Sequence, residues 1–228
     1  PGTVQREGEC MANEKAIDTR IQEIRNQFNP SDLDGPPEQI LNALNRFEKD
    51  TQRAIHHKGL AAVVKWHKSL YLQKARLFSR SEELLDEALT KLEALDDDHF
   101  QRWRLKIYLS LGYNHRSQCN YPDAEFYLKE ALKLSLTEPD LNKFQGEIYS
   151  LLGSVNYKLN RFNKAIKYVG QERRKAHDLY QSNPAYAVIY AYSLYDHCRM
   201  TRLIGATDPK VDAELSEAVE LFEKMGYT

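Results

Sequence analysis

The stretch GYNHRSQCNYPDAEFYLKEALKL, residues 112–134, has a counterpart in GSVNYKLNRFNKAIKYVGQERRKAH, residues 153–177. In each copy a glycine is followed nine residues later by an aromatic residue, and three residues after that by an alanine. The two glycines are 153 − 112 = 41 residues apart, and so are the two alanines, at 165 − 124 = 41. A repeat of this length is typical of stacked helical units, and it favours binding over catalysis.

The composition of the chain bears on its partners and its location. The 228 residues carry 32 basic and 33 acidic side chains, a net charge of −1, which argues against nucleic acid or an anionic membrane as partner. No apolar run approaches the ~18 residues that span a bilayer. The cysteines at 10, 119 and 198 are unclustered, which favours a reducing compartment and therefore a cytoplasmic location. Residues 1–10 are polar and are interpreted as a tag or a disordered leader.

Apolar periodicity predicts an all-α chain of about ten helices. Residues 11–58 are predicted to form an N-terminal helical pair that caps a solenoid. Residues 59–228 are predicted to form four helical hairpins, at about 60–95, 100–136, 141–180 and 184–225.

Large and small residues recur at matched positions of the two central hairpins. They are Tyr108, Leu111, Gly112, Tyr121, Ala124, Leu128 and Ala131 in one, and Tyr149, Leu152, Gly153, Phe162 and Ala165 in the next. At these positions the sequence resembles the tetratricopeptide repeat family, in a variant whose spacing exceeds the usual ~34 residues. The resemblance implies a right-handed superhelical solenoid of antiparallel hairpins that binds a protein or peptide and serves as a sensory, regulatory or scaffold domain.

In that family the first helix of each hairpin lines the concave groove. The resemblance therefore implies a groove whose predicted binding residues are Trp66, Lys74, Lys106, Tyr113, Arg116, Glu147, Ser154, Tyr157 and Lys158. Cations and aromatic rings predominate among them, which suits an extended peptide that carries carboxylates and apolar groups. Two further residues of the first helices, Asn114 and Asn156, are expected at the helix surface beside this groove.

An alternative function is oligomerisation. The segment YAVIYAYSLY, residues 186–195, is rich in tyrosine and is expected to be buried on several sides. The final helix shows no polar capping face, although a solenoid needs one for solubility. A homodimer through these C-terminal helices is therefore a second hypothesis.

Neither an enzyme nor a cofactor site is predicted. The seven histidines form no ligand-like spacing for a metal, and neither a phosphate-binding glycine loop nor a nucleophile elbow occurs. His197 and Cys198 are adjacent on a predicted helix, so their side chains are expected to point to different faces. A Cys–His nucleophile pair is disfavoured for that reason.

Overall fold

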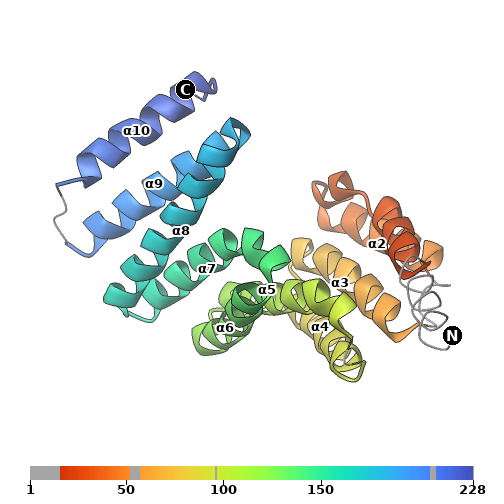
Figure 1. The fold of residues 1–228 in the computed structure, drawn as a ribbon. Coiled ribbons are helices and arrows are strands. Elements are labelled where there is room, and N and C mark those ends of the chain that lie inside the picture. Colours follow the sequence, from red (N-terminus) through yellow and green to blue (C-terminus); the bar gives the residue numbers. More distant parts are fainter. Residues whose placement is uncertain (1–15, 52–56, 96, 206–208, 228) are drawn as a thin grey trace, which may run out of the picture. The chain divides into compact units, whose positions relative to one another are not determined.

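The computed structural model is helical wherever it describes the chain (Figure 1). It describes residues 16–51, 57–95, 97–205 and 209–227. Within these ranges α-helices and short 3-10 segments make up the secondary structure and no strand occurs, which confirms the all-α class. The predicted leader, residues 1–10, and the start of the predicted N-terminal pair lie outside the described residues.

The chain divides into two compact units, Pro1–Gln118 and Cys119–Thr228. The elements of the first unit are a helix over residues 16–27, η1 (Pro30–Leu33), α2 (Pro37–Asp50), α3 (Lys58–Lys74), α4 (Phe78–Glu93), η3 (Asp98–Phe100) and α5 (Gln101–Ser117). Those of the second are α6 (Tyr121–Thr137), η4 (Pro139–Phe144), α7 (Gln145–Lys158), α8 (Phe162–Ser182), η5 (Pro184–Tyr186), α9 (Ala187–Leu203) and α10 (Val211–Lys224).

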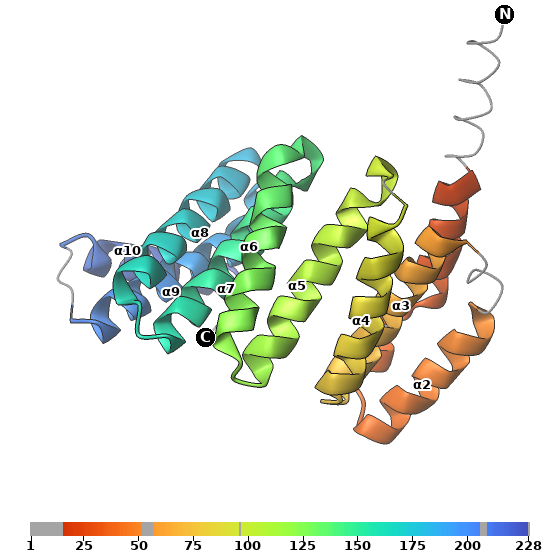
Figure 2. The same ribbon diagram turned by 90° about the horizontal axis from the view of Figure 1, so that it is seen from below.

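Consecutive helices lie side by side within each unit. In the first unit α3 packs against α4, and in the second α7 packs against α8 and α9 against α10 (Figure 2). Neighbouring hairpins also touch inside a unit, since α4 contacts α5 and α8 contacts α9. Within the described ranges there are ten α-helices, the helix over residues 16–27 and α2 to α10, in agreement with the predicted number.

A left-handed residue follows each first helix. Its φ is 59° at Arg76, 61° at Cys119, 58° at Asn160 and 69° at Gly205. The separations are 43, 41 and 45 residues (119 − 76, 160 − 119, 205 − 160), close to the offset of the sequence echo. After α3 the Leu77 N–H donates to the Leu72 carbonyl, and after α7 the Arg161 N–H donates to the Asn156 carbonyl, both over 2.8 Å. This is the hydrogen bond of a Schellman motif. The sequence repeat thus corresponds to a repeated turn.

The N-terminal helices are held to α3 by aromatic rings. Phe28 lies between the helix over residues 16–27 and α2, and its ring centroid is 5.3 Å from that of Tyr71. Phe47 of α2 lies 5.8 Å from the same tyrosine ring. Since Phe47 and Tyr71 are fully buried, this cluster forms the core at that end of the first unit.

A glycine allows the close approach of α7 and α8. A Cβ atom at Gly153 would lie 2.7 Å from Cγ2 of Val169, closer than carbon atoms can approach without movement. Gly170 on α8 is different, because nothing lies within 4 Å of the corresponding position. The repeat glycine is therefore required by packing, whereas the second glycine is not.

We expect Gly153→Ala to lower the free energy of unfolding by about 1–3 kcal/mol, the usual cost of forcing an extra methyl group into a packed contact. The matched control Gly170→Ala should raise it by about 1 kcal/mol, because alanine is the better residue inside a helix. Urea unfolding followed by circular dichroism measures both. Equal effects of the two substitutions would contradict the packing role of Gly153.

Candidate functional site

The first unit contains an ammonium group between two indole rings. Trp66 on α3 and Trp103 on α5 have ring centroids 5.3 Å apart at an interplanar angle of 66°. The Lys106 Nζ lies 4.2 Å from the centroid of Trp66 and 4.6 Å from that of Trp103. The indole of Trp66 is itself fixed, since its Nε1 donates to the Ser110 hydroxyl over 3.0 Å. This aromatic–cation cluster is therefore built by packing between two first helices.

The predicted residues of the first unit form two contacts. Besides Trp66 with Lys106, the Arg116 guanidinium lies 5.4 Å from the ring centroid of Tyr113, which is 39 % exposed. Lys74 is exposed at the end of α3. These five residues lie on α3 and α5; Lys74 and Tyr113 are exposed, and Trp66, Lys106 and Arg116 are partly buried.

The predicted residues of the second unit lie on α7. Glu147 and Lys158 are exposed, and Ser154 is partly buried. Tyr157 packs against the core formed by Ala165, Val169 and Met200, so its ring serves the fold. A groove that joins this set with that of the first unit stays a prediction.

The expectation for the two asparagines was wrong. Asn114 and Asn156 are both fully buried. The Asn114 amide donates to the Ser81 hydroxyl over 3.0 Å, and the Asn156 amide donates to the Leu152 carbonyl over 2.9 Å. Their side chains are therefore part of the interior, where a buried amide needs such acceptors.

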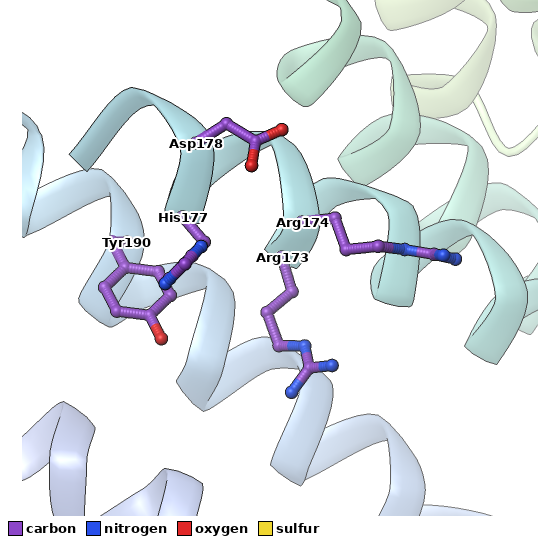
Figure 3. A pocket seen from close by; sticks show the side chains of 5 residues that line it. All are labelled: Arg173, Arg174, His177, Asp178 and Tyr190. Atoms are coloured by element: carbon purple, nitrogen blue, oxygen red, sulfur yellow. The ribbon is translucent and has the colours of Figure 1, made fainter. Parts of the chain in front are cut away.

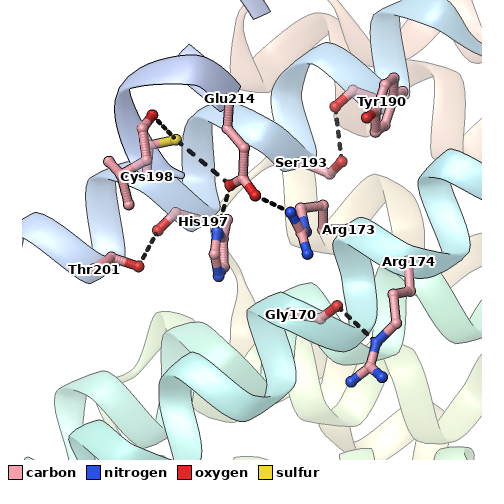
Figure 4. A network of polar contacts seen from close by, with 10 residues as sticks. Gly170, Arg173, Arg174, Tyr190, Ser193, His197, Cys198, Thr201 and Glu214 are labelled. Atoms are coloured by element: carbon pink, nitrogen blue, oxygen red, sulfur yellow. Dashed lines mark hydrogen bonds and ion pairs between the residues drawn. The ribbon is translucent and has the colours of Figure 1, made fainter. Parts of the chain in front are cut away.

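A buried polar network in the second unit escaped the sequence analysis (Figure 4). The Glu214 carboxylate on α10 accepts a hydrogen bond from Arg173 on α8. The His197 Nδ1 on α9 lies 2.8 Å from the other carboxylate oxygen, and the Cys198 thiol lies 3.9 Å from that same oxygen. One carboxylate thus connects three helices. The only sequence signal is the separation of Arg173 and Glu214 by 41 residues, the repeat offset.

The network corrects the expectation for His197 and Cys198. Both side chains approach Glu214 instead of diverging. Cys198 is nevertheless 1 % exposed, its thiol also donates to the Val211 carbonyl, and burial raises its pKa. A nucleophilic cysteine needs a lowered pKa and access, so this arrangement serves the fold.

A cavity of about 260 Å³ lies beside this network (Figure 3). Its lining residues are Arg173, Arg174, His177, Asp178 and Tyr190. The Arg173 and Arg174 side chains point in different directions, so the two guanidinium groups do not converge on one ligand. Burial raises the pKa of Tyr190 to about 12, and the nearby Glu217 carboxylate adds to the rise.

Glu172 on α8 has an unusual environment. Burial raises the pKa of this carboxyl group to about 7, the charge of Asp196 adds to the rise, and a hydrogen bond with Ser150 opposes it. One of its oxygens is buried without a hydrogen-bond partner. The group is therefore close to half-protonated at neutral pH.

The tyrosines of η5 and α9 differ from the expectation of burial. Tyr190 is 6 % exposed, whereas Tyr186 is 38 % and Tyr192 is 53 % exposed. The Tyr192 ring lies 5.0 Å from that of Phe222 on α10. The tyrosine-rich segment is thus buried on one side and open on the other.

Comparison with models of known protein families found no match, and neither did comparison with curated proteins. In the described ranges, no three His, Cys, Asp or Glu side chains are grouped so that they could hold a metal ion. Across those ranges no helix combines the length and the apolar character needed to traverse a bilayer.

His67 lies beside the aromatic–cation cluster. Its ring centroid is 4.7 Å from that of Trp66, and its Nδ1 lies 2.9 Å from the Val63 carbonyl oxygen. Burial lowers the pKa of His67 from 6.5 to about 4; the Val63 hydrogen bond opposes this, and the charges of Lys106 and Arg25 add to the lowering. The imidazole is therefore neutral at physiological pH.

We expect the first unit to lose stability as the pH falls from about 6.5 to about 4. In this window the unfolded chain binds a proton at residue 67 and the folded chain does not, so unfolding is favoured by up to about 3 kcal/mol at the acid end. Urea unfolding at several pH values, followed by tryptophan fluorescence, measures the loss. His67→Gln should reduce this pH dependence, and the exposed His177→Gln should not. An unchanged profile in His67→Gln would contradict the assignment.

Proposed function

We propose that this chain is a helical-repeat module that binds a protein or peptide segment. Its hairpins would stack as a right-handed superhelix of the tetratricopeptide repeat type, with the first helices facing the ligand. The observation that carries the proposal is the position of Lys106 between Trp66 and Trp103. Free thiols at Cys119 and Cys198 fit a reducing, cytoplasmic location.

The chemistry of this surface suits a peptide with acidic and apolar residues. The rings hold the Lys106 ammonium in place without neutralising it, because the attraction comes from the ring quadrupole. The ammonium can then form a charge-assisted hydrogen bond with a carboxylate. Apolar side chains of the ligand can contact the exposed ring of Tyr113.

The spacing of the cations suits an extended segment. Lys106 and Arg116 are ten residues apart on α5, which places their backbones roughly 15 Å apart along the helix. An extended peptide covers this distance with roughly five residues. Two carboxylates at that separation would meet both cations.

The polar network of the second unit does not add a reaction to this proposal. Its histidine and cysteine, His197 and Cys198, are buried against Glu214. A raised thiol pKa makes the cysteine a poor nucleophile. The proposal therefore assigns no reaction to these groups.

The two tryptophans of the chain both lie in the cluster, so intrinsic fluorescence reports on this surface. We expect a peptide of alternating glutamate and leucine to change the fluorescence saturably, and its lysine–leucine counterpart to have no effect. Lys106→Glu and Arg116→Glu should each weaken binding at least about tenfold, because a charge-assisted hydrogen bond becomes a repulsion.

The matched control is Arg80→Glu, which reverses the charge of an exposed arginine. Arg80 lies on α4, whereas the predicted binding residues of the first unit lie on α3 and α5. It should bind as the unchanged chain does. Circular dichroism shows that each variant is folded. Unchanged affinity in both Lys106→Glu and Arg116→Glu would reject the assignment of this surface.

A second candidate function is self-association through α9 and α10. The supporting observation is a group of exposed apolar side chains on these helices. They are Ile189, Tyr192, Tyr195 and Val219, between 45 % and 53 % exposed. Exposed apolar side chains of this size on two packed helices are candidates for an interface.

Sedimentation velocity over a concentration series tests this candidate. We expect dimers that dissociate on dilution, and Tyr192→Glu should shift the equilibrium to the monomer because it places a charge in the apolar contact. Phe126→Glu, at a similarly exposed position on α6, is the control that should leave the dimer intact. A strict monomer at all concentrations would exclude self-association.

A further inference from the structure

The surface of α8 carries a row of cations that the fold does not neutralise. The members of this α8 cation row are Lys164, Lys167, Arg174 and Lys175, of which the last is partly buried and the others are exposed. Within the described residues, Arg173 is the one side chain of α8 that takes part in an ion pair. The row is therefore available to an anionic partner.

Helix geometry aligns the α8 cation row. Lys164 and Lys175 are eleven residues apart, close to three turns, so they project from the same side of α8. Lys167 and Arg174 are seven residues apart, close to two turns, and follow the adjacent ridge. From Lys164 to Arg174 the row extends over roughly 15 Å of the helix axis. The cations thus form a linear array.

Gly170 makes an opening in the second ridge, three residues after Lys167 and four residues before Arg174. No described atom lies within 4 Å of the position that a Cβ atom would take there. The Arg174 Nε donates to the Gly170 carbonyl over 3.4 Å, which holds the guanidinium group beside this opening (Figure 4). A glycine inside a helix is less stable than alanine, and packing does not require this one. A ligand that approaches the helix backbone accounts for it.

The charges around the row leave it positive. In α8, which the structure describes throughout, Asp178 is the one exposed carboxylate, so the exposed side has a net charge of 4 − 1 = +3. The neighbouring α7 adds one exposed charge of each sign, Glu147 and Lys158. The undescribed residues of this unit, 206–208 and 228, contain one carboxylate side chain, Asp208. Counted against the row, it leaves a balance of 3 − 1 = +2.

The other carboxylate of α8, Glu172, belongs to the packing of three helices. It is partly buried, and its neighbours are Ser150 on α7 and Asp196 on α9. Asp196 is itself paired with Arg199 over 3.1 Å. Neither carboxylate forms an ion pair with a member of the α8 cation row.

The exposed side of α8 lacks the apolar anchors of a protein interface. The one large apolar side chain of this helix that is exposed is Phe162, and its ring lies 5.7 Å from that of Tyr157. Protein interfaces depend on buried aromatic or aliphatic anchors, whereas contacts with a nucleic-acid backbone depend on lysine and arginine. A nucleic acid therefore fits the row better than an acidic protein segment does.

The near-neutral charge of the whole chain is compatible with such a local attraction. Exposed charges act over a Debye length of only about 10 Å at 0.1 M salt, so distant carboxylates do not cancel the row. The nearby ring of Tyr168 already stacks on that of Tyr149, at a centroid distance of 6.2 Å. We therefore expect contacts with the backbone of the nucleic acid and no sequence preference.

Two amides lie among the cations. Asn163 is exposed and Gln171 is partly buried, and neither side chain has a hydrogen-bond partner in the part of the chain that the structure describes. An amide can both donate and accept a hydrogen bond, and so can the ribose 2′-hydroxyl group. These residues favour RNA over DNA.

We propose that the α8 cation row binds the phosphodiester backbone of single-stranded RNA. At a spacing of roughly 3.4 Å per phosphate, a strand places about four phosphates along the row. The opening at Gly170 lets one of them approach the helix between Lys167 and Arg174. This site lies in the second unit and does not depend on the peptide surface of α3 and α5.

A fluorescein-labelled uridine decamer is the probe, titrated with the full chain and followed by fluorescence anisotropy. We expect binding to weaken about 50-fold between 50 mM and 200 mM salt, because four phosphate contacts in a single strand give a logarithmic slope of about −2.8. Lys167→Gln and Arg174→Gln should each weaken binding and reduce the magnitude of this slope by about 0.7, since each removes one contact.

The matched control is Lys133→Gln, which removes an exposed cation of α6 and should change neither the affinity nor the slope. Gly170→Leu should weaken binding at least about threefold because its side chain covers the opening. Circular dichroism shows that each variant is folded. Absence of binding to the uridine decamer, or unchanged affinity in both Lys167→Gln and Arg174→Gln, would reject the site. Unchanged affinity in Gly170→Leu would reject the role of the opening.

Two further probes test the choice of RNA. A glutamate decamer of similar charge should bind at least about tenfold more weakly, and equal affinity would instead indicate an acidic protein segment as partner. A deoxythymidine decamer lacks the 2′-hydroxyl groups and should bind at least about threefold more weakly. Equal affinity for it would contradict the assignment to RNA.

The two proposed binding sites can be separated by experiment. Lys167→Gln should leave binding of the glutamate–leucine peptide unchanged, because Lys167 lies outside the peptide surface. Lys106→Glu should leave binding of the uridine decamer unchanged, because Lys106 lies outside α8. Loss of both responses in folded Lys167→Gln would show that the α8 cation row is not a distinct site.

Discussion

The left-handed turn after each first helix is the constraint on which the hairpins of both units depend. At Arg76, Asn160 and Gly205 a positive φ reverses the chain within a few residues, and the next helix runs back beside the last. Between α7 and α8 the crossing also requires a small residue, because a Cβ atom at Gly153 would meet Val169. The recurrent turn thus sets the direction of each second helix, and the local side chains set how closely it approaches the first.

Local pattern was enough to predict the helices. Apolar spacing predicts an all-α chain of about ten helices, and the described residues form ten helices and no strand. The same pattern could not place Asn114 and Asn156. Their helical phase lies at the edge of the buried face, and burial there depends on an acceptor for the amide, which Ser81 of α4 supplies to Asn114 and the Leu152 carbonyl of the same helix supplies to Asn156. The helical phase of a residue predicts the direction of its side chain, and the contacts of that side chain decide whether it is buried.

Part of the candidate site could be predicted from the sequence. Trp66 and Lys106 were identified because the first helices of a repeat protein present such residues, and they do meet. Trp103 was not, because no matched repeat position points to it. Its contact with Trp66 is set by the packing of α3 on α5, which the fold alone determines.

The two units use their cations in different ways, and this difference explains where the peptide ligand is expected. In the second unit Arg173 of α8 forms an ion pair with Glu214 of α10, so its guanidinium group stabilises the packing of these helices. In the first unit aromatic rings hold Lys106. A ring quadrupole fixes the position of an ammonium group without cancelling its charge. The first unit therefore holds the Lys106 ammonium in a preformed position, which lowers the side-chain entropy that the proposed anionic ligand would cost it on binding.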